Sequence, residues 1–304
     1  MDAHKAQYEV IIIGGGFAGA SAALTLGRLK RSVLMLDSGS PCNRYSDAVH
    51  NLLLSEGVSP NDAKDGFKKS LSGYPTVTCR EDAAASLERG DGIWTIATAS
   101  GAAFTALRVL FCTGLADRLP PVPGMEACWG KTVLHCPYCH GYEMRGTVGI
   151  ATSSVDESLA LASVLHSLGL KMVLFTAPAP ELTESQARLV NKLGVLLTEG
   201  TLAALHHDHG KLRAVLLADG RQAALDYLYI GSVAVQHSDL PVRAGCELTD
   251  RNLIRINDFH ETSVPGIFAA GDCCSTIRYA SAAMASGNIA ASFIHQDLCR
   301  SFAT

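Results

Sequence analysis

Two cysteines separated by two residues carry the strongest chemical signal in the sequence. Cys136 and Cys139 enclose a Pro-Tyr dipeptide and are flanked by His135 and His140. Thiols at this spacing can close a small disulfide ring. A neighbouring imidazole can lower the pKa of a thiol or move its proton. The spacing therefore indicates redox chemistry or metal ligation.

Two other uses of the cysteine pair are open. A zinc site takes four ligands, but the sequence has no second C-x-x-C, and the two cysteines with their flanking histidines would crowd one short turn. An inert buried pair is the other alternative. The remaining cysteines of the ten have no regular spacing, and a chain of 304 residues needs no disulfide framework. We favour a redox function for Cys136 and Cys139 and assign no metal ligand.

A glycine-rich turn near the start of the chain predicts a dinucleotide site. The turn reads G-G-G-F-A-G, lies between an apolar run and an Ala- and Leu-rich segment, and is followed by Asp37 at the end of the next apolar run. Such glycines let the backbone approach a pyrophosphate at a helix N-terminus, and the acid accepts hydrogen bonds from ribose hydroxyls. A glycine-rich turn beside a solvated Asp is the simpler alternative. The predicted binding residues are Gly14, Gly16, Phe17, Ala18, Gly19 and Asp37.

Apolar runs and turn residues predict an α/β chain. The predicted strands are 8–13, 32–36, 94–97, 108–111, 148–151, 172–176 and 195–198, and the predicted helices are 17–30, 156–168, 184–193 and 279–298. Residues 38–74 are polar and turn-rich, so we expect loops with short helices there. Turn signals at 208–210 and 219–220 predict a β-meander. We expect residues 1–117 and 245–304 to form one domain, into which a second domain, 118–244, is inserted.

Bulk composition excludes several classes of function. Hydrophobic residues make up 48% of the chain and charged residues 18%, as in folded globular proteins. The net charge of −4 shows no basic excess, so we expect no nucleic-acid partner. The N-terminus has no apolar h-region and the chain no span long enough for a bilayer. We therefore expect a cytoplasmic protein without a membrane partner.

Two further motifs lead to a family resemblance. Residues 266–272 read G-I-F-A-A-G-D and residues 112–114 read C-T-G, which resemble the second FAD motif and the A-T-G motif of two-dinucleotide-binding flavoproteins. With the first fingerprint and the C-x-x-C, this order resembles the low-molecular-weight thioredoxin reductase family over nearly the whole chain. The version C-P-Y-C-H-G-Y-E resembles the branch of dithiol oxidases of gliotoxin and holomycin biosynthesis, which close disulfides with FAD and pass electrons to oxygen.

The resemblance implies two Rossmann-like domains, the second inserted in the first, with FAD as cofactor and a homodimer as assembly. It implies that Cys139 faces the flavin, that Cys136 meets the substrate, and that His140 replaces the Asp that donates a proton in standard thioredoxin reductases. In that family an Arg-Gln pair contacts the flavin, but Tyr279 holds the Gln position here. The additional cofactor residues that it implies are Asn51, Thr113, Gly114, Gly271, Asp272, Arg278 and Tyr279.

A second nucleotide fingerprint, for NADPH, is missing from the inserted domain. The matching turn, 151–157, reads A-T-S-S-V-D-E and has no glycine. Asp156 and Glu157 place negative charge where phosphates would lie. The loop at 177–181 has no Lys or Arg for a 2′-phosphate. We therefore do not expect efficient use of NADPH.

Three functions follow. The first is an FAD-dependent dithiol oxidase that acts on a small-molecule or peptide dithiol and uses oxygen as acceptor. The second is a disulfide reductase fed by NADPH or ferredoxin, with a thioredoxin-like protein as a conceivable partner. The third is a flavin redox sensor without turnover. The sequence does not fix the direction of electron flow.

Overall fold

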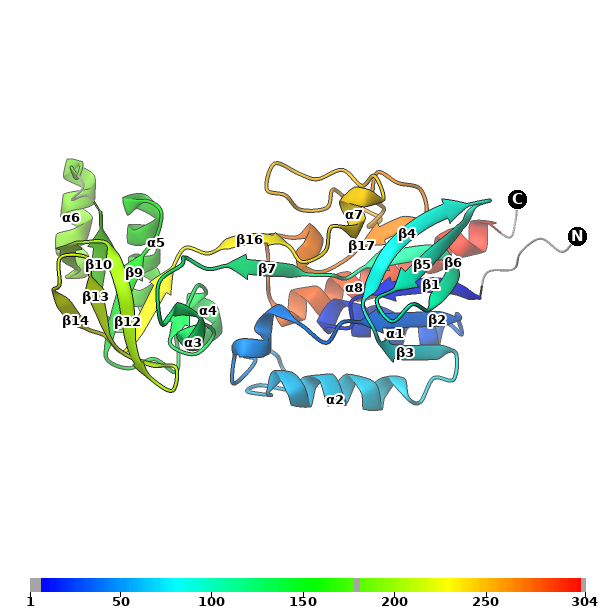
Figure 1. Cartoon of the computed structure of the whole chain (residues 1–304), viewed down its shortest axis with the longest axis horizontal. Coiled ribbons are helices and arrows are strands. Elements are labelled where there is room, and N and C mark those ends of the chain that lie inside the picture. Colours follow the sequence, from blue (N-terminus) through cyan, green and yellow to red (C-terminus); the bar gives the residue numbers. More distant parts are fainter. Residues whose placement is uncertain (1–6, 178–180, 302–304) are drawn as a thin grey trace, which may run out of the picture. The chain divides into compact units, whose positions relative to one another are not determined.

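The computed structural model describes residues 7–177 and 181–301, which form two compact units (Figure 1). The first unit consists of the chain up to Arg44, Asn51–Ala116 and the chain from Ala234. The second consists of Tyr45–His50 and Asp117–Val233. Both units contain a parallel sheet and helices, so the predicted α/β class, with one unit inserted in the other, is confirmed.

The first unit is built on a seven-stranded sheet of order β3-β2-β1-β6-β5-β4, with β17 paired to β6. Its strands are β1 (Tyr8–Ile13), β2 (Val33–Asp37), β3 (Val77–Glu81), β4 (Ala84–Gly90), β5 (Ile93–Thr98), β6 (Ala103–Phe111) and β17 (Ile267–Ala269). β6 pairs antiparallel with β5 along its first half and parallel with β17 along its second half. The predicted strands at 8–13, 94–97 and 108–111 are confirmed.

The register of the parallel strands brings their carboxyl ends together. Ile13 lies opposite both Leu36 and Phe111, and Phe111 lies opposite Ala269. Loops that follow β1, β2, β6 and β17 therefore leave the sheet at one edge, where open parallel sheets bind their ligands.

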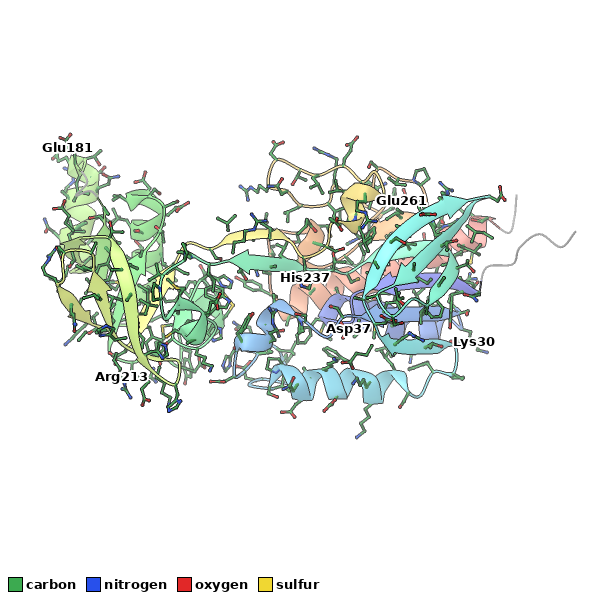
Figure 2. The ribbon with its side chains drawn as sticks, viewed as in Figure 1. Lys30, Asp37, Glu181, Arg213, His237 and Glu261 are labelled. Carbon is green, nitrogen blue, oxygen red and sulfur yellow. A yellow bond between two sulfur atoms is a disulfide. The ribbon has the colours of Figure 1, made fainter. Side chains whose placement is uncertain are left out.

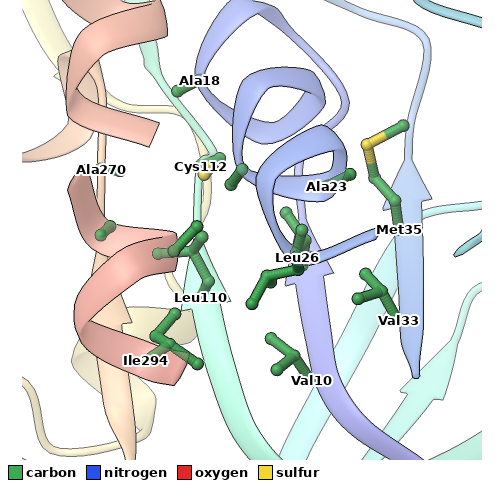
Figure 3. Close-up of a cluster of buried hydrophobic side chains, with 14 of the residues drawn as sticks. Val10, Ala18, Ala23, Leu26, Val33, Met35, Leu110, Cys112, Ala270 and Ile294 are labelled. Atoms are coloured by element: carbon green, nitrogen blue, oxygen red, sulfur yellow. The ribbon is translucent and has the colours of Figure 1, made fainter. Parts of the chain in front are cut away.

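Two helices cover one face of this sheet, α1 (Phe17–Arg28) and α8 (Ala280–Ser301). Figure 3 shows Leu26 of α1 and Ile294 of α8 packed with Val10 and Leu110 of the sheet, and all four side chains are fully buried. Small residues let the helices approach closely, because a Cβ at Gly287 would lie 2.0 Å from the carbonyl oxygen of Ala18. Sheet and helix pair therefore form one continuous apolar core.

One helix in the polar region 38–74 is longer than the sequence led us to expect. Instead of loops with short helices, the structure has the twelve-residue α2 (Pro60–Leu71), preceded by the short η1 (Cys42–Tyr45). The Ser59 hydroxyl caps α2 by accepting a hydrogen bond from the Asp62 amide at 3.1 Å. The helix buries only Ala63 and Leu71, so its apolar residues are few and most of its sequence is polar.

The second unit contains a five-stranded parallel sheet of order β11-β10-β9-β15-β8 and a three-stranded antiparallel sheet of order β12-β13-β14. Its strands are β8 (Val133–Leu134), β9 (Thr147–Ala151), β10 (Lys171–Thr176), β11 (Leu196–Glu199), β12 (Leu202–Asp208), β13 (Lys211–Leu217), β14 (Gln222–Ala224) and β15 (Tyr227–Ile230). Its helices are α3 (Met125–Cys128), α4 (Pro137–His140), α5 (Val155–His166) and α6 (Glu184–Leu193). The predicted strand–helix alternation and β-meander are confirmed.

The remaining elements are β7 (Leu115–Arg118), β16 (Val233–Gln236), α7 (Leu240–Arg243) and η2 (Asp272–Cys274). β7 and β16 pair with each other where the chain runs between the units. Over the described residues, no helix is long and apolar enough to cross a bilayer.

The close approach of α1 and α8 can be tested with Gly287→Ala. The new methyl group would meet the Ala18 carbonyl, so a helix must move, and we expect a loss of about 1–3 kcal/mol in the free energy of unfolding. Gly66→Ala in α2 is the matched control, since its Cβ meets no described atom within 4 Å and should stabilise by roughly 0.5–1 kcal/mol. Urea unfolding measures both, and an unchanged Gly287→Ala stability would contradict the packing.

Candidate active site

The turn between β1 and α1 is shaped by the glycines predicted to bind a nucleotide. A Cβ at Gly14, where φ is +110°, would lie 2.2 Å from the Cys112 carbonyl oxygen, and one at Gly19 would lie 1.9 Å from that of Gly14. At Gly16 a Cβ would meet no described atom within 4 Å. Within the described chain, no side chain caps the N-terminus of α1. The turn is thus tightly packed at Gly14 and Gly19, and it has open space at Gly16, beside the uncapped N-terminal amides of α1.

Asp37 ends β2 beside this turn (Figure 2). Its Oδ1 accepts a hydrogen bond from the Gly15 amide at 3.3 Å, and its Oδ2 lies 3.6 Å from Lys64 Nζ. The carboxylate is therefore held against the glycine turn, in the place predicted for an acid that binds a ribose. Lys64, from α2, was not among the predicted site residues.

The two later motifs follow β6 and β17 at the same edge of the sheet. The Thr113 hydroxyl is buried and has no hydrogen-bond partner among the described residues. Gly271 has φ +79°, and its Cβ would lie 2.8 Å from that of Ala18 in α1. Asp272 Oδ2 lies 3.7 Å from Arg278 Nε. The unsatisfied hydroxyl, the uncapped helix and the open space at Gly16 fit a bound dinucleotide.

The other predicted cofactor residues also belong to the first unit. Gly114, with φ +64°, follows Thr113, and its carbonyl accepts a hydrogen bond from the His237 amide at 3.4 Å. Tyr279 immediately precedes α8 and is partly exposed. Asn51 adopts a left-handed backbone conformation, with φ +58°.

The cysteine pair lies in the second unit, at the start of α4. Cys136 is the N-cap of this one-turn helix and forms a disulfide with Cys139 across a Cα–Cα distance of 5.4 Å. Both cysteines are half-buried, and the Tyr229 hydroxyl donates a hydrogen bond to the Cys136 carbonyl at 3.5 Å. Among the described residues, no cluster of His, Cys, Asp and Glu could hold a metal ion. The pair is thus shown as a disulfide that remains near solvent.

His140, beside the disulfide, is surrounded by other ionisable groups. Its ring centroid lies 6.1 Å from that of His50, at an angle of 88° between the rings. Burial lowers the pKa of His140, and the neighbouring His50 lowers it further, whereas Glu143 and Asp47 act in the opposite direction. His140 is therefore neutral at neutral pH and can accept a proton from a thiol.

The second histidine beside the pair has a different environment. His135 is exposed and stacks on the buried ring of Trp129, with centroids 5.4 Å apart and an angle of 23°. Stacking holds one face of this imidazole against an apolar surface. The two flanking histidines thus have different surroundings: His135 packs on an aromatic ring, and His140 lies among ionisable groups.

Sequence reasoning missed the partners of His140. His50 comes from the short segment Tyr45–His50, which belongs to the second unit although its neighbours in the chain do not. Glu143 lies four residues after Cys139, but spacing alone did not give it a role. The only available signal for His50 was its position beside the predicted flavin residue Asn51.

Comparison with known proteins now defines the family. Residues 8–287 match the model of the pyridine nucleotide-disulphide oxidoreductases. The chain belongs to this family. It is 28% identical over 296 residues to "Thioredoxin reductase aclD" of Aspergillus oryzae, with 93% of this chain and 94% of that protein covered.

Two solved structures extend the likeness. An oxidoreductase from Agrobacterium tumefaciens superimposes with a TM-score of 0.89 at 29% identity, over 96% of this chain and 98% of that chain. The crystal structure of HlmI superimposes with a TM-score of 0.88 at 30% identity, over 96% of this chain and 93% of that chain. The chain is therefore an enzyme, a flavin-dependent disulfide oxidoreductase, and the resemblance to thioredoxin reductases is confirmed.

A substitution at Gly16 can distinguish a loss of dinucleotide binding from a loss of folding. Gly16→Val would place methyl groups where no described atom lies within 4 Å, so the fold should be retained while the space for a dinucleotide is filled. We expect a flavin-to-protein ratio at least about tenfold lower, which corresponds to about 1.4 kcal/mol of binding. Gly90→Val, at an equally open position in β4, is the control and should remain yellow. Absorbance of the purified proteins and urea unfolding of their flavin-free forms measure the two effects, and a fully yellow Gly16→Val protein would contradict the assignment.

Proposed function

We propose that the protein is an FAD-dependent dithiol oxidase. Its Cys136–Cys139 disulfide would oxidise a dithiol in a small molecule or peptide, with oxygen as the final electron acceptor. The observation that supports this direction of electron flow is the state of the turn between β9 and α5, where a thioredoxin reductase would need to bind NADPH.

Side chains of the protein itself fill this turn. The Ser154 hydroxyl caps α5 by accepting a hydrogen bond from the Glu157 amide at 3.2 Å, and Ser153 donates one to the Glu157 carboxylate at 2.6 Å. Asp156, also in the first turn of α5, accepts a hydrogen bond from Gln186 at 2.7 Å. An amide that a pyrophosphate would need is thus occupied, and two carboxylates lie beside it.

The residues do not fit NADPH for these reasons, and we derive no step through it. The second sequence argument concerned the loop 177–181, whose residues 178–180 lie outside the described part of the chain. Its lack of Lys and Arg is a property of the sequence. In the proposed oxidase, electrons enter through the disulfide rather than through a nicotinamide.

The residues at the disulfide fit the exchange reaction. A substrate thiolate attacks Cys136, the S–S bond breaks, and Cys139 leaves as a thiolate. The second substrate thiol then displaces Cys136, which releases the product disulfide and leaves two enzyme thiols. His140 accepts the proton of the attacking thiol and returns it to the leaving sulfur, for which its neutral form is required. FAD, when bound, supplies a two-electron acceptor that oxygen can reoxidise.

The cofactor residues proposed for FAD all belong to the first unit. They are Gly14, Gly16, Phe17, Ala18, Gly19, Asp37, Asn51, Thr113, Gly114, Gly271, Asp272, Arg278 and Tyr279. Their support is the glycine turn, the carboxylate beside it and the unsatisfied Thr113 hydroxyl.

A homodimer is part of the same proposal. Met284 and Ile289 of α8 expose apolar side chains, as does Phe259, whose ring packs edge-on against Phe293 at 5.0 Å. Exposed apolar groups of this kind are typical of subunit interfaces.

A disulfide reductase is the second candidate, because the relative from Aspergillus oryzae is named a thioredoxin reductase. In that case ferredoxin or NADPH would supply electrons, and a small disulfide or a thioredoxin-like protein would accept them. The same two cysteines and His140 would then carry out the exchange in reverse.

Anaerobic titration of the purified holoenzyme distinguishes the two directions. We expect dithiothreitol to bleach the flavin and NADPH to leave it oxidised, because the β9–α5 turn repels phosphates. Admission of air should then restore the colour with about one peroxide per flavin, as a two-electron oxidation requires. Rapid bleaching by NADPH would support the reductase, and no bleaching by either donor would support a sensor.

The role of the redox pair can be tested with Cys136→Ser. The remaining Cys139 cannot form the intramolecular disulfide, so turnover of dithiols should fall by at least about a thousandfold. The protein should remain yellow, since the proposed cofactor residues lie in the other unit. Cys128→Ser, a buried cysteine of the same unit, is the control and should retain activity. Oxygen consumption measures turnover, and normal turnover by Cys136→Ser would rule out the assigned pair.

A further inference from the structure

Two imidazoles lie beside the disulfide in the second unit, although they come from distant parts of the chain. His50 ends the segment Tyr45–His50, and His140 ends the one-turn helix α4 that carries Cys139. Their ring centroids are 6.1 Å apart, with one ring edge directed at the other. Only His140 has a role in the exchange reaction described above.

An acid completes the cluster. Glu143 Oε1 lies 3.7 Å from His50 Nδ1, and the side chain of His50 is 18% exposed whereas that of Glu143 is 47% exposed. The charged groups that face His140 are His50, Glu143 and Asp47. A positive charge on His50 at this distance disfavours a second positive charge on His140, so it lowers the pKa of His140.

The exchange reaction needs a group that can pass protons on. Oxidation of one dithiol breaks the enzyme S–S bond and forms one in the product, so two electrons pass from substrate sulfur to Cys136 and Cys139. Each substrate thiol must lose its proton to react, while Cys139 leaves as a thiolate. His140 can hold one proton at a time. A second imidazole, nearer to an exposed carboxylate, gives that proton a path away from the half-buried sulfur atoms.

We propose that His50 and Glu143 form a proton relay with His140, in which His50 keeps His140 free to accept a proton from a substrate thiol. This inference rests on the proposed function, because it concerns the thiol–disulfide exchange at Cys136 and Cys139. His50 is a positioning residue here, since it acts through His140 rather than on sulfur. Burial and the charge of His50 both lower the pKa of His140, as such a relay requires.

The test compares the pH dependence of disulfide reduction in the holoenzyme. Dithiothreitol is the probe under anaerobic conditions, and the freed thiols are trapped by rapid alkylation. His50→Gln removes a neighbouring positive charge, so the pKa of His140 rises. The acidic limb of the pH–rate profile, where the rate falls as His140 is protonated, should therefore move to higher pH by between about 0.5 and about 2 units. At pH values between the two limbs the variant is slower than the wild type, because His140 of the variant is already protonated there.

Two further variants distinguish charge from structure. His50→Arg keeps a positive charge near Glu143, so its acidic limb should stay within about 0.3 pH units of the wild type. Its plateau rate should fall, because a guanidinium cannot pass on a proton. His206→Gln removes an exposed imidazole of β12 in the same unit and should change nothing. A limb that does not move in His50→Gln, or that moves equally in His50→Arg, would overturn the relay.

A second measurement does not depend on turnover. NMR titration of the histidine ring protons in the holoenzyme should show the pKa of His140 raised in His50→Gln and lowered in Glu143→Gln, because the carboxylate favours the charged imidazole. Glu143 is substantially exposed, so this variant keeps the test available if His50→Gln fails to fold. Unchanged pKa values in both variants would contradict the proposal. If the wild-type enzyme makes no peroxide, but the acidic limb moves in His50→Gln as described, the oxidase is refuted and the relay is retained.

Discussion

The first unit depends on backbone contacts that leave no room for a Cβ atom. Gly14 lies against the Cys112 carbonyl, Gly19 against the carbonyl of Gly14, and Gly287 against that of Ala18. These contacts bring β1, β6, α1 and α8 to distances that larger residues would prevent. The same closeness places the amides of the α1 N-terminus at the edge where the parallel strands end. Packing and the proposed dinucleotide binding therefore depend on one set of glycines.

The second unit repeats the strand–turn–helix pattern without this constraint. Between β9 and α5 the chain has hydroxyl side chains in place of glycines, and Ser154 caps the helix that in the first unit is uncapped. A hydroxyl cap satisfies one amide, and the carboxylates of Asp156 and Glu157 complement the helix dipole. The N-terminus of α5 is thus stabilised by the protein's own side chains, which take the place that a bound anion could occupy. Two helix starts of similar geometry consequently differ in what they can bind.

Sequence patterns predicted most of this arrangement, since the buried strands are continuous apolar runs and α6 has a capping box at Thr183 followed by a terminal Gly194. The same approach underestimated α2, because a helix that buries only Ala63 and Leu71 is mostly polar and resembles a loop in composition. The C-x-x-C was evident from its spacing, and its disulfide is present. The pairing of His50 with His140 had no local signal, because it depends on how the chain folds back rather than on neighbouring residues.

An imidazole at His140, where the resemblance places an acid, has a physical consequence for proton transfer at the disulfide. A group that only donates a proton to a reduced flavin or sulfur can start as a carboxylic acid. A group that must take a proton from an incoming thiol has to be an unprotonated base near neutral pH, and a half-buried imidazole repelled by a second imidazole meets that condition. The imidazole serves the exchange in either direction, because a base for the incoming thiol is the acid of the reverse step. The filled β9–α5 turn is therefore the feature that favours electrons that enter from sulfur, because its hydroxyl cap and carboxylates oppose a phosphate donor there.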